Sequence, residues 1–354
     1  MSKKIVVALI FGGRSPEHEI SLISASAIHR NMDGAKFEVR SIYVTKAGLW
    51  RSVEAPSLDI KALSRGRAFS FLPWQGRDLR WKVPADIYFP VLHGRFGEDG
   101  TIQGLLEMAD VPYVGAGVLG SALAMDKAAA KSLFKEQGLP VVPWLVVREE
   151  DWRVRKQDIL RRIGKDFAPP FFVKPANLGS SVGITKVKDH RRAGAALETA
   201  FRYDAKVLVE KGITGREIEC SVLGNEAPEA SLPGEVIPFR EFYDYNDKYV
   251  DGKTRFVVPA GLSRPLTKRV RRLAVEAFKA LECSGMARVD FFLEARTNHL
   301  YVNEVNTIPG FTEISMYPKL WEASGLPFPR LVERLVSLGF ERHRARKTCI
   351  DRGR

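Results

Sequence analysis

Several features that define other classes of protein are scarce in this 354-residue chain. Its three cysteines, Cys220, Cys283 and Cys349, are scattered and include no C-x-x-C pair. This argues against a disulfide framework or a zinc site and fits a reducing cytoplasm. The apolar run near the start, "IVVALIF", is far too short to span a bilayer, and no small-residue cleavage site follows it. We therefore expect neither a membrane segment nor a secretory signal.

Low-complexity tracts and internal repeats of 20 to 50 residues are also missing, and the length predicts two or three compact units. Acidic residues are in deficit, because 55 lysines and arginines face 42 aspartates and glutamates. Much of the excess lies in "RPLTKRVRR" at 264–272 and in the last fourteen residues, "ERHRARKTCIDRGR". Aromatic residues are not interleaved with these runs, as a single-strand stacking platform requires. A solvated basic surface that favours anionic small-molecule substrates is the better interpretation, and nucleic-acid binding is the minor alternative.

The N-terminal third alternates apolar strands with helices. The strands are "KIVVALIF", "KFEVRSIYV" and "ADIYFPVLH", and helices are expected from Ile20 and from about Thr101 to Ala109. Repeated βα units predict a parallel sheet, in which ligands bind where loops leave the carboxyl ends of the strands. Both Gly-rich turns, at 12–13 and 94–100, follow strands in this sense. Residues 51–80 show no clear period, and we expect an irregular excursion there.

The rest of the chain predicts a second α/β region that begins near Gly120. One helix is expected over "SALAMDKAAAKSLFKEQG", and another follows Ser263 as its N-cap and ends before Gly285. A Tyr-rich stretch at 240–262 suits a mobile loop, and a last helix covers "RLVERLVSLGF". The expected strands are "PPFFVKP", "VGITKV", "KVLVEK", "REIECSV", "RVDFFLE" and "HLYVNEVN".

Polar side chains share one face of the two late strands. Alternation along "RVDFFLE" places Arg288, Asp290 and Phe292 on one face, and the same parity pairs Glu304 with Asn306 in "VNEVN". Oxygen ligands of this kind suit Mg²⁺, particularly when a phosphate shares the metal. Arg288 strengthens this interpretation, because a cation near phosphate stabilises developing negative charge. The alternative is an ordinary polar strand face.

A second polar motif, "KPANLGSSVGITKV" at 174–187, joins two predicted strands through a Gly-Ser-Ser turn. Backbone amides of such a turn can bind an anion, and Lys174 supplies a point charge for phosphate. The motif is not a P-loop, since the G-x-x-x-x-G-K-[ST] pattern does not occur in the chain. A surface hairpin with a solvated lysine is the alternative from these residues alone.

Taken together, the motifs resemble those of D-alanine–D-alanine ligases, members of the ATP-grasp superfamily. The resemblance covers essentially residues 3 to 338, while the basic segment after Phe340 matches nothing in the family. The motifs follow the family's order: "FGGRSPEHEIS", "HGRFGEDGTIQG", "MDK", "KPANLGSSVGITKV", "EFYDYNDKY", "ARVDFF" and "NEVNTIPGFTEIS". The resemblance implies an α/β ATP-grasp fold, in which a Rossmann-like parallel-sheet domain precedes two α+β subdomains that sandwich ATP. The implied units are 1–119, 120–215 with the phosphate flap, 216–340 with the lid and Mg site, and a basic tail at 341–354.

The resemblance also implies the reaction. The enzyme would ligate two D-alanines at the expense of ATP through a D-alanyl phosphate, for peptidoglycan synthesis. ATP is the co-substrate, and two Mg²⁺ ions (or Mn²⁺ in their place) would bind Asp290, Glu304 and Asn306. A cytoplasmic homodimer is implied, with neither nucleic acid nor a membrane as partner.

Site residues follow from motif position. Glu17 would pair with the ammonium of the first D-alanine, and Arg288 with the amide of Gly310 would stabilise the acyl phosphate and the oxyanion. The implied substrate-binding residues are Glu17, His93, Arg288, Gly310 and Ser315. The implied catalytic residues are Glu17, Ser180, Arg288, Tyr249 and Lys248. The implied nucleotide-binding residues are Lys127, Lys174, Ser180, Ser181, Glu210, Lys211, Ile213, Glu217, Lys248, Phe292 and Glu304.

Alternatives remain for several of these residues. Glu17 could be a first-turn glutamate that the helix dipole favours. His93, which is expected on the same side as Glu98, could be a structural histidine at a strand end. Ser315 could be a helix N-cap. The Lys248–Tyr249 pair in the lid favours D-alanine over D-lactate as acceptor and leaves D-serine open. Another ATP-grasp carboxylate–amine ligase and a nucleotide-binding regulatory protein with degenerate catalysis are the competing functions.

Overall fold

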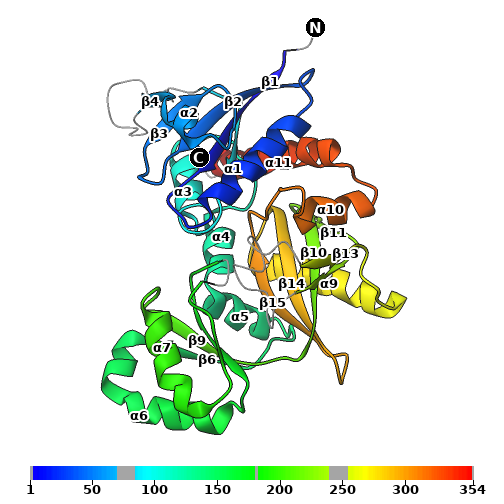
Figure 1. Cartoon of the computed structure of the whole chain (residues 1–354). Helices are drawn as coiled ribbons and strands as arrows, with labels where there is room; N and C mark the ends of the chain where they lie inside the picture. The colour runs from blue at the N-terminus through cyan, green and yellow to red at the C-terminus, as the bar shows by residue number, and fades with distance from the viewer. Residues whose placement is uncertain (1–2, 70–83, 180–181, 239–253, 353–354) are drawn as a thin grey trace.

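The computed structural model describes residues 3–69, 84–179, 182–238 and 254–352. Strands in these segments form three sheets, one in the upper part of Figure 1 and two in the lower part. None of the helices described here is both long and apolar enough to cross a membrane.

The first sheet has the strand order β4-β3-β2-β1-β5, and β1 pairs in parallel with both β2 and β5. Its strands are β1 (Ile5–Gly12), β2 (Phe37–Val44), β3 (Trp50–Val53), β4 (Arg67–Phe69) and β5 (Ile87–Val91). Its helices are α1 (His18–Asn31), α2 (Ile60–Ser64) and α3 (Thr101–Met108). The expectation of an irregular stretch over 51–80 is wrong for its described part. Antiparallel β3 and β4 extend the sheet there, and both strands are too short to show a period.

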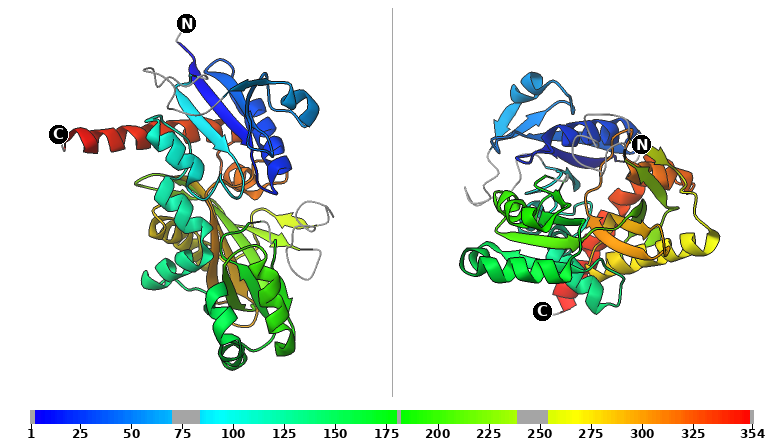
Figure 2. Two further views of the ribbon diagram at one scale, coloured as in Figure 1. Left: turned by 90° about the vertical axis from the view of Figure 1, so that its left-hand side faces the viewer. Right: turned by 60° about the horizontal axis from the view of Figure 1, so that its bottom comes forward.

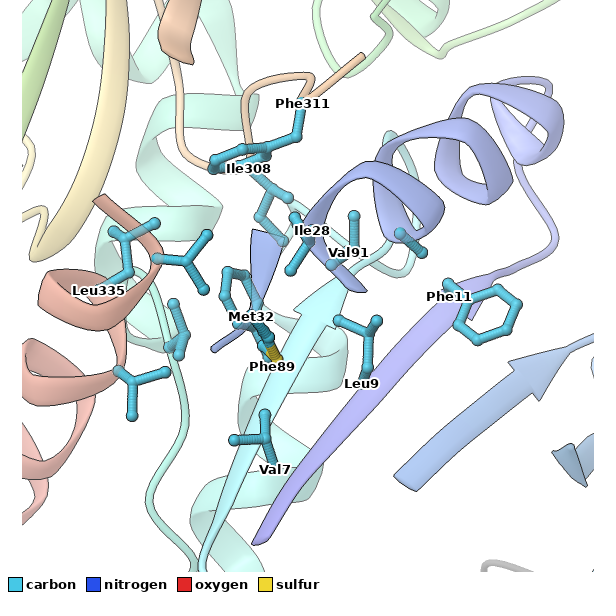
Figure 3. Packing of buried hydrophobic residues seen from close by; sticks show 14 of the residues in the cluster. Val7, Leu9, Phe11, Ile28, Met32, Phe89, Val91, Ile308, Phe311 and Leu335 are labelled. Atoms are coloured by element: carbon cyan, nitrogen blue, oxygen red, sulfur yellow. The ribbon is translucent and has the colours of Figure 1, made fainter. Parts of the chain in front are cut away.

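The core beside this sheet includes residues from the far end of the chain. Leu9 on β1 and Phe89 on β5 are fully buried, as expected of strands covered on both faces. Leu335 of the last helix packs into the same cluster, as do Ile308 and Phe311 from the loop after strand β15 (Leu300–Asn306) (Figure 3). The chain therefore returns to its N-terminal layer and anchors a late loop there.

The second sheet is antiparallel, with the order β6-β9-β7-β8. Its strands are β6 (Trp144–Arg148), β7 (Phe171–Pro175), β8 (Thr185–Val187) and β9 (Lys206–Lys211), and its helices are α6 (Glu149–Asp166), η1 (His190–Arg192) and α7 (Ala193–Phe201). The single helix expected before this sheet is two, α4 (Val118–Met125) and α5 (Lys127–Glu136). Asp126 breaks the helix with an extended ψ of 97°, and its carboxylate caps α5 by accepting from the amides of Ala128 and Ala129 at 3.1 Å.

The third sheet has the order β13-β12-β10-β14-β15, with β11 paired to β10. Its strands are β10 (Gly215–Gly224), β11 (Glu229–Ala230), β12 (Gly234–Ile237), β13 (Arg255–Val257), β14 (Gly285–Glu294) and β15 (Leu300–Asn306). Helix α9 (Arg264–Ala280) begins after Ser263, whose hydroxyl accepts from the amide of Leu266, so the predicted N-cap is confirmed. Helix α10 (Met316–Ala323) follows the loop after β15.

The segment at 341–354, expected as a tail, is helical as far as it is described. It continues α11 (Phe328–Arg352), which projects beyond the rest of the molecule in Figure 2. Arg342 stacks over the ring of Tyr113 at 3.9 Å from its centroid and donates to Glu107 at 3.1 Å. Arg346 donates to Asp110 at 2.9 Å. The basic side chains thus tie the helix to the acidic end of α3, which the sequence pattern alone did not reveal.

Candidate active site

Two adjoining cavities lie where the three sheets meet. One has a volume of about 840 Å³ and is lined by the N-terminal layer and the loop after β15. The other has a volume of about 520 Å³ and lies between the second and third sheets. The residues that line both cavities are Glu98, Gly179, Glu219, Arg288, Glu304 and Asn306. A reaction between a ligand in each cavity would take place beside these side chains.

The shared wall is the polar face of β14 and β15. Asp290 lies opposite Glu304 and Arg288 opposite Asn306 in the antiparallel register. A bulge after Asp290 leaves Asn303 without a register partner and keeps this pairing intact. The alternate residues of β14 face the core, so the predicted polar face is confirmed.

Arg288 is clamped by carboxylates on this face. Its guanidinium donates to both oxygens of Asp290 at 2.7 Å and lies 3.1 Å from Glu219 on β10. Burial by itself would lower the pKa of Arg288, but the charges of Asp290 and Glu219 raise that pKa well above its usual value. Arg288 therefore stays charged, and its position is fixed from two sides.

The donor set on this face fits Mg²⁺. Asn306 donates its side-chain amide to Asp290 at 3.1 Å, which leaves its amide oxygen outside that bond, and Asn306 and Glu304 line both cavities. Among the described residues, no group of three or more His, Cys, Asp or Glu side chains could hold a metal by itself. Two carboxylates and one amide are the incomplete oxygen set that Mg²⁺ accepts when phosphates and waters supply the remaining ligands.

The smaller cavity collects the residues expected to bind nucleotide. Lys127 begins α5, donates to the carbonyl of Leu178 at 2.8 Å and lies 3.6 Å from Glu304. Lys174 lies near the end of β7, and its side chain pairs with Glu210 of β9 at 2.5 Å. The expected residues that line this cavity are Lys127, Lys174, Glu210, Lys211, Ile213, Glu217, Phe292 and Glu304.

The larger cavity collects all the residues expected to bind substrate: Glu17, His93, Arg288, Gly310 and Ser315. Glu17 precedes the first turn of α1 and does not cap it through its side chain. Its carboxylate lies so close to Gly94 and Gly179 that a Cβ there would come within 2.7 and 3.1 Å of Oε2. Gly94 also has a φ of +72°, which favours glycine. These two glycines leave room for the carboxylate of Glu17 to face the cavity.

His93 is buried and uses both ring nitrogens within the protein. Nε2 lies 3.0 Å from the hydroxyl of Ser24, and Nδ1 lies 3.0 Å from the carbonyl of Ile308. The carbonyl of Ile308 can only accept, so Nδ1–H donates to it, and in the neutral ring Nε2 accepts from the hydroxyl of Ser24, whose oxygen in turn accepts the amide of Phe311. Burial lowers the pKa of His93, which keeps the ring neutral although the charge of Glu17 opposes this. The geometry favours the structural alternative that the sequence left open for His93.

Glu98 links the same loop to the N-terminal layer. It accepts the amide of Gly94 at 2.8 Å and the amide of Ile308 at 3.1 Å. Burial, with a further contribution from the charge of Glu17, raises the pKa of Glu98 to about 8. Its carboxyl therefore bridges two segments on the floor of both cavities.

Ser315 precedes α10 but does not cap it. Its hydroxyl accepts the amide of Thr312 at 3.0 Å and lies 2.8 Å from the Thr312 hydroxyl. A Cβ at Gly310 would come within 2.7 Å of the same Ser315 oxygen. The loop is compact, and it presents the Gly310 backbone and the Ser315 hydroxyl to the larger cavity.

Four expected site residues, Ser180, Ser181, Lys248 and Tyr249, lie outside the described residues, so their roles stay predictions. Two further residues were not singled out from the sequence. Glu219 follows Glu217 by two positions on β10, so strand alternation could have found it. Lys131 follows Lys127 by one helical turn on α5 and could have been found by that spacing.

A G-x-G-x-x-G pattern formed by Gly115, Gly117 and Gly120 has no part in the site. It overlaps the start of α4, with Gly117 at the N-cap and Gly120 inside the helix, and none of its glycines lines either cavity. A Cβ at Gly120 would come within 2.7 Å of the carbonyl of Glu282, so this glycine allows close packing of two backbones.

Comparison with known proteins gives one consistent family. Models described as "D-ala D-ala ligase N-terminus" and "D-ala D-ala ligase C-terminus" match residues 6–116 and 133–337. The D-alanine–D-alanine ligase of Solibacter usitatus is 52% identical over 344 residues, covering 97% of this chain and 98% of that protein. The ligase of Caldicellulosiruptor bescii is 48% identical over 357 residues, covering 98% of each chain.

Solved structures agree. The D-alanine–D-alanine ligase from Coxiella burnetii matches with a TM-score of 0.86 and 40% identity, covering 99% of this chain and 98% of that one. The VanG D-Ala:D-Ser ligase from Enterococcus faecalis matches with a TM-score of 0.84 and 35% identity, covering 95% of this chain and 100% of that one.

Proposed function

The chain belongs to the D-alanine–D-alanine ligase family and has the ATP-grasp fold, and we propose how its two cavities divide the work of that reaction. It catalyses the ATP-dependent ligation of two D-alanines to D-alanyl-D-alanine for peptidoglycan synthesis. The smaller cavity would hold ATP and the larger one the two D-alanines. The observation that supports this division is that both cavities share Arg288, Glu304 and Asn306.

In the smaller cavity we propose that Lys127 and Lys174 contact the phosphates of ATP. Glu210 would accept from the adenine amino group, Lys211 and Ile213 would bind the base through their backbones, and Glu217 would bind the ribose. Phe292 lies on the same wall. Ser180 and Ser181 would cover the phosphates from the flap.

Asp290, Glu304 and Asn306 are proposed to hold two Mg²⁺ ions, for which Mn²⁺ can substitute. Bound there, the metal ions would neutralise the γ-phosphate so that a carboxylate can approach it. Arg288 lies beside them, held by Asp290 and Glu219 and directed at the junction of the cavities.

Two steps balance the reaction. The carboxylate of the first D-alanine, whose ammonium pairs with Glu17, attacks the γ-phosphorus, and ADP leaves as D-alanyl phosphate forms. The amine of the second D-alanine then attacks the carbonyl carbon, loses a proton, and displaces phosphate through a tetrahedral intermediate. Arg288 and the amide of Gly310 would stabilise its oxyanion, and one fixed donor of this kind typically contributes about 3–4 kcal/mol. Ser315 would bind the carboxylate of the second D-alanine.

The remaining assignments are proposals of the same kind. Lys248 and Tyr249 would close over the site with Ser180 and favour an amine acceptor, since acyl phosphates hydrolyse in open water. His93 is proposed as a wall of the substrate cavity. The functional units would be 1–119, 120–215 and 216–340, with 341–354 apart from the site, in a cytoplasmic homodimer.

One assay tests the reaction and the choice of acceptor. D-alanine, D-serine and D-lactate are offered together with ATP and Mg²⁺, and the products are separated while phosphate release is measured. We expect D-alanyl-D-alanine as the main product and no phosphate release without D-alanine. An Arg288→Met variant should bind ATP but form no product. Phosphate release with a different acid–amine pair and none with D-alanine would refute the proposal.

A further inference from the structure

A cluster of three charged side chains lies behind the nucleotide cavity. Glu210 on β9 pairs through one oxygen with Lys174 at 2.5 Å and through the other with Lys131 at 2.6 Å. All three residues are buried, and Lys131 has no exposed surface. We call Lys131, Glu210 and Lys174 the buried charge cluster.

Lys131 does not reach the cavity. Lys174 and Glu210 line it, whereas Lys131 does not. Lys131 lies one turn after Lys127 on α5, so both lysines project from the same face of that helix. Lys127 reaches the cavity from the first turn, and Lys131 contacts Glu210 from behind. Any effect of Lys131 on a bound ligand must therefore pass through Glu210.

Charge balance explains why a third buried charge is useful here. Lys174 and Glu210 alone would form a neutral pair, and a neutral pair attracts phosphate weakly. Lys131 supplies a second positive charge to Glu210, so the cluster carries a net charge of plus one toward the cavity. Burying three charges is costly, and such clusters stay charged only when each member is paired. Paired with both lysines, the carboxylate of Glu210 stays ionised and can accept a hydrogen bond from the adenine amino group.

We propose that Lys131 is a positioning residue for the nucleotide: it holds Glu210 as an oriented carboxylate and leaves the positive charge of Lys174 available to phosphate. This inference rests on the proposed nucleotide roles of Glu210 and Lys174. The pKa of Glu210 is lowered, because Lys131 and Lys174 outweigh the effect of burial, and this agrees with an ionised Glu210. The pKa of Lys131 is lowered by burial, and the charge of Glu210 opposes that shift, so the ion pair is what favours a charged Lys131.

The first experiment replaces Lys131 by methionine and measures equilibrium binding of ATP and of adenosine, together with the KM for D-alanine. Adenosine affinity should fall because Glu210 is less well oriented toward the base, and ATP affinity should fall at least tenfold further because Glu210 then neutralises Lys174. The KM for D-alanine should change less than twofold. Lys135→Met is the matched control, because Lys135 is exposed one turn further along the same helix, and it should bind ATP as the wild type does. Equal losses for ATP and adenosine in Lys131→Met would overturn the proposal.

A second variant separates this role from a merely structural one. In Lys131→Met/Glu210→Gln the carboxylate of Glu210 is gone, so it no longer offsets the positive charge of Lys174. The ATP affinity of the double variant should recover to within about threefold of that of Glu210→Gln alone. Discrimination between ATP and GTP should be lost in both the single Glu210→Gln variant and the double variant. If Lys131→Met lowers ATP affinity tenfold in the Glu210→Gln background as well, Lys131 does not act through Glu210 and the proposal is wrong. This comparison holds even where the single Lys131 variant fails to fold.

The failure of the inference can be distinguished from the failure of the proposed function. Lys174→Met tests the nucleotide role by itself. If it leaves ATP affinity unchanged, the assignment of the smaller cavity to ATP is wrong. If it weakens ATP binding while Lys131→Met does not, only the role of Lys131 is refuted.

Discussion

Replacing Phe311 by leucine should weaken the binding of D-alanine and leave ATP binding unchanged. Phe311 is fully buried, and its ring centroid lies 6.4 Å from that of Phe89, 5.5 Å from that of Tyr317 and 5.8 Å from that of Phe328. It follows Gly310 in the loop that lines the substrate cavity. The ring therefore anchors, in the N-terminal core, a loop that also carries Ser315.

The size of the stability effect can be worked out from these contacts. Leucine buries less apolar surface than phenylalanine, which costs about 1 kcal/mol. Each aromatic pair adds about 0.5–1.5 kcal/mol beyond its area, so losing the three pairs adds about 1.5–4.5 kcal/mol and brings the total to about 2.5–5.5 kcal/mol. The backbone amide of Phe311, which donates to Ser24 at 3.2 Å, is retained in the variant. The chain should therefore still fold, with a looser loop.

The assay compares Phe311→Leu with a variant that loses another ring of the same cluster. Phe89→Leu removes one ring from the same cluster, on β5, and leaves the Phe311 ring of the loop in place with its contacts to Tyr317 and Phe328. Both variants should lose free energy of unfolding in urea, by about 2 kcal/mol for Phe89→Leu from its area and its aromatic pair. The KM for D-alanine should rise roughly tenfold or more only in Phe311→Leu, because a small displacement of a positioning group is costly to catalysis. ATP affinity should stay within twofold in both.

The reasoning would be refuted by either of two results. If both variants raise the KM for D-alanine equally, the effect comes from general loosening of the core. If Phe311→Leu loses stability but keeps its KM, the loop holds its geometry without the ring.

Further expectations follow from the same walls of the site. In Gly310→Ala the new Cβ should clash with the Ser315 hydroxyl, displace it from the Thr312 amide and raise the KM for D-alanine. Gly310→Ala/Ser315→Ala removes this clash, so it should recover stability in thermal melts but should keep the raised KM. Glu219→Gln removes a charged partner of Arg288 and should lower the free energy of unfolding by about 1.5–3 kcal/mol. It should also lower kcat more than ATP affinity, and an equal kcat in the wild type and the variant would contradict this. The pKa of Glu98 is about 8 in the folded state, against an ordinary value of 4.5, so between these pH values only the folded state holds the proton. The free energy of unfolding should therefore fall as the pH rises, by up to about 1.4 kcal/mol per pH unit. Glu98→Gln should remove this part of the slope in unfolding curves at pH 5 to 8, and the same pH dependence in the wild type and the variant would contradict it.

The sequence predicted most readily those parts of the molecule that depend on local periodicity. Alternation along β14 and β15 placed Asp290 beside Glu304 because a strand has a period of two and the two strands pair in antiparallel register. The continuous apolar run of β1 identified a strand buried on both faces, because such a strand needs no alternation with polar residues. These inferences need no knowledge of distant contacts.

Other parts could not be predicted in this way. The break between α4 and α5 depends on Asp126, whose side chain caps the second helix and also pairs with Lys206 on β9. Periodicity continued across the break, so a single helix was the natural expectation. The ion pairs of α11 with Glu107 and Asp110 join residues more than 200 positions apart, and charge composition alone made that helix look like a free tail.

His93 shows the limit for single residues. Its position at a strand end beside a Gly-rich turn suits either a substrate contact or a structural role. The tertiary arrangement, which brings Ser24 of α1 and Ile308 of a distant loop to the two ring nitrogens, favours the structural role, while the substrate contact stays a prediction. Contacts of this kind depend on the return of the chain to its N-terminal layer.

That return has a mechanical consequence for the site. Asn306 ends the proposed metal-binding strand, and Ile308, two residues later, is buried in the N-terminal core, where Glu98 also accepts its amide. The third sheet and the N-terminal layer are thus joined rigidly at the point where the two cavities meet. With ATP in the smaller cavity as proposed, we expect its entry to separate the second sheet from the third, since both line that cavity. Lys127 lies at this boundary, because it donates to the carbonyl of Leu178 after β7 and lies 3.6 Å from Glu304 on β15, so we expect nucleotide entry to rearrange its contacts.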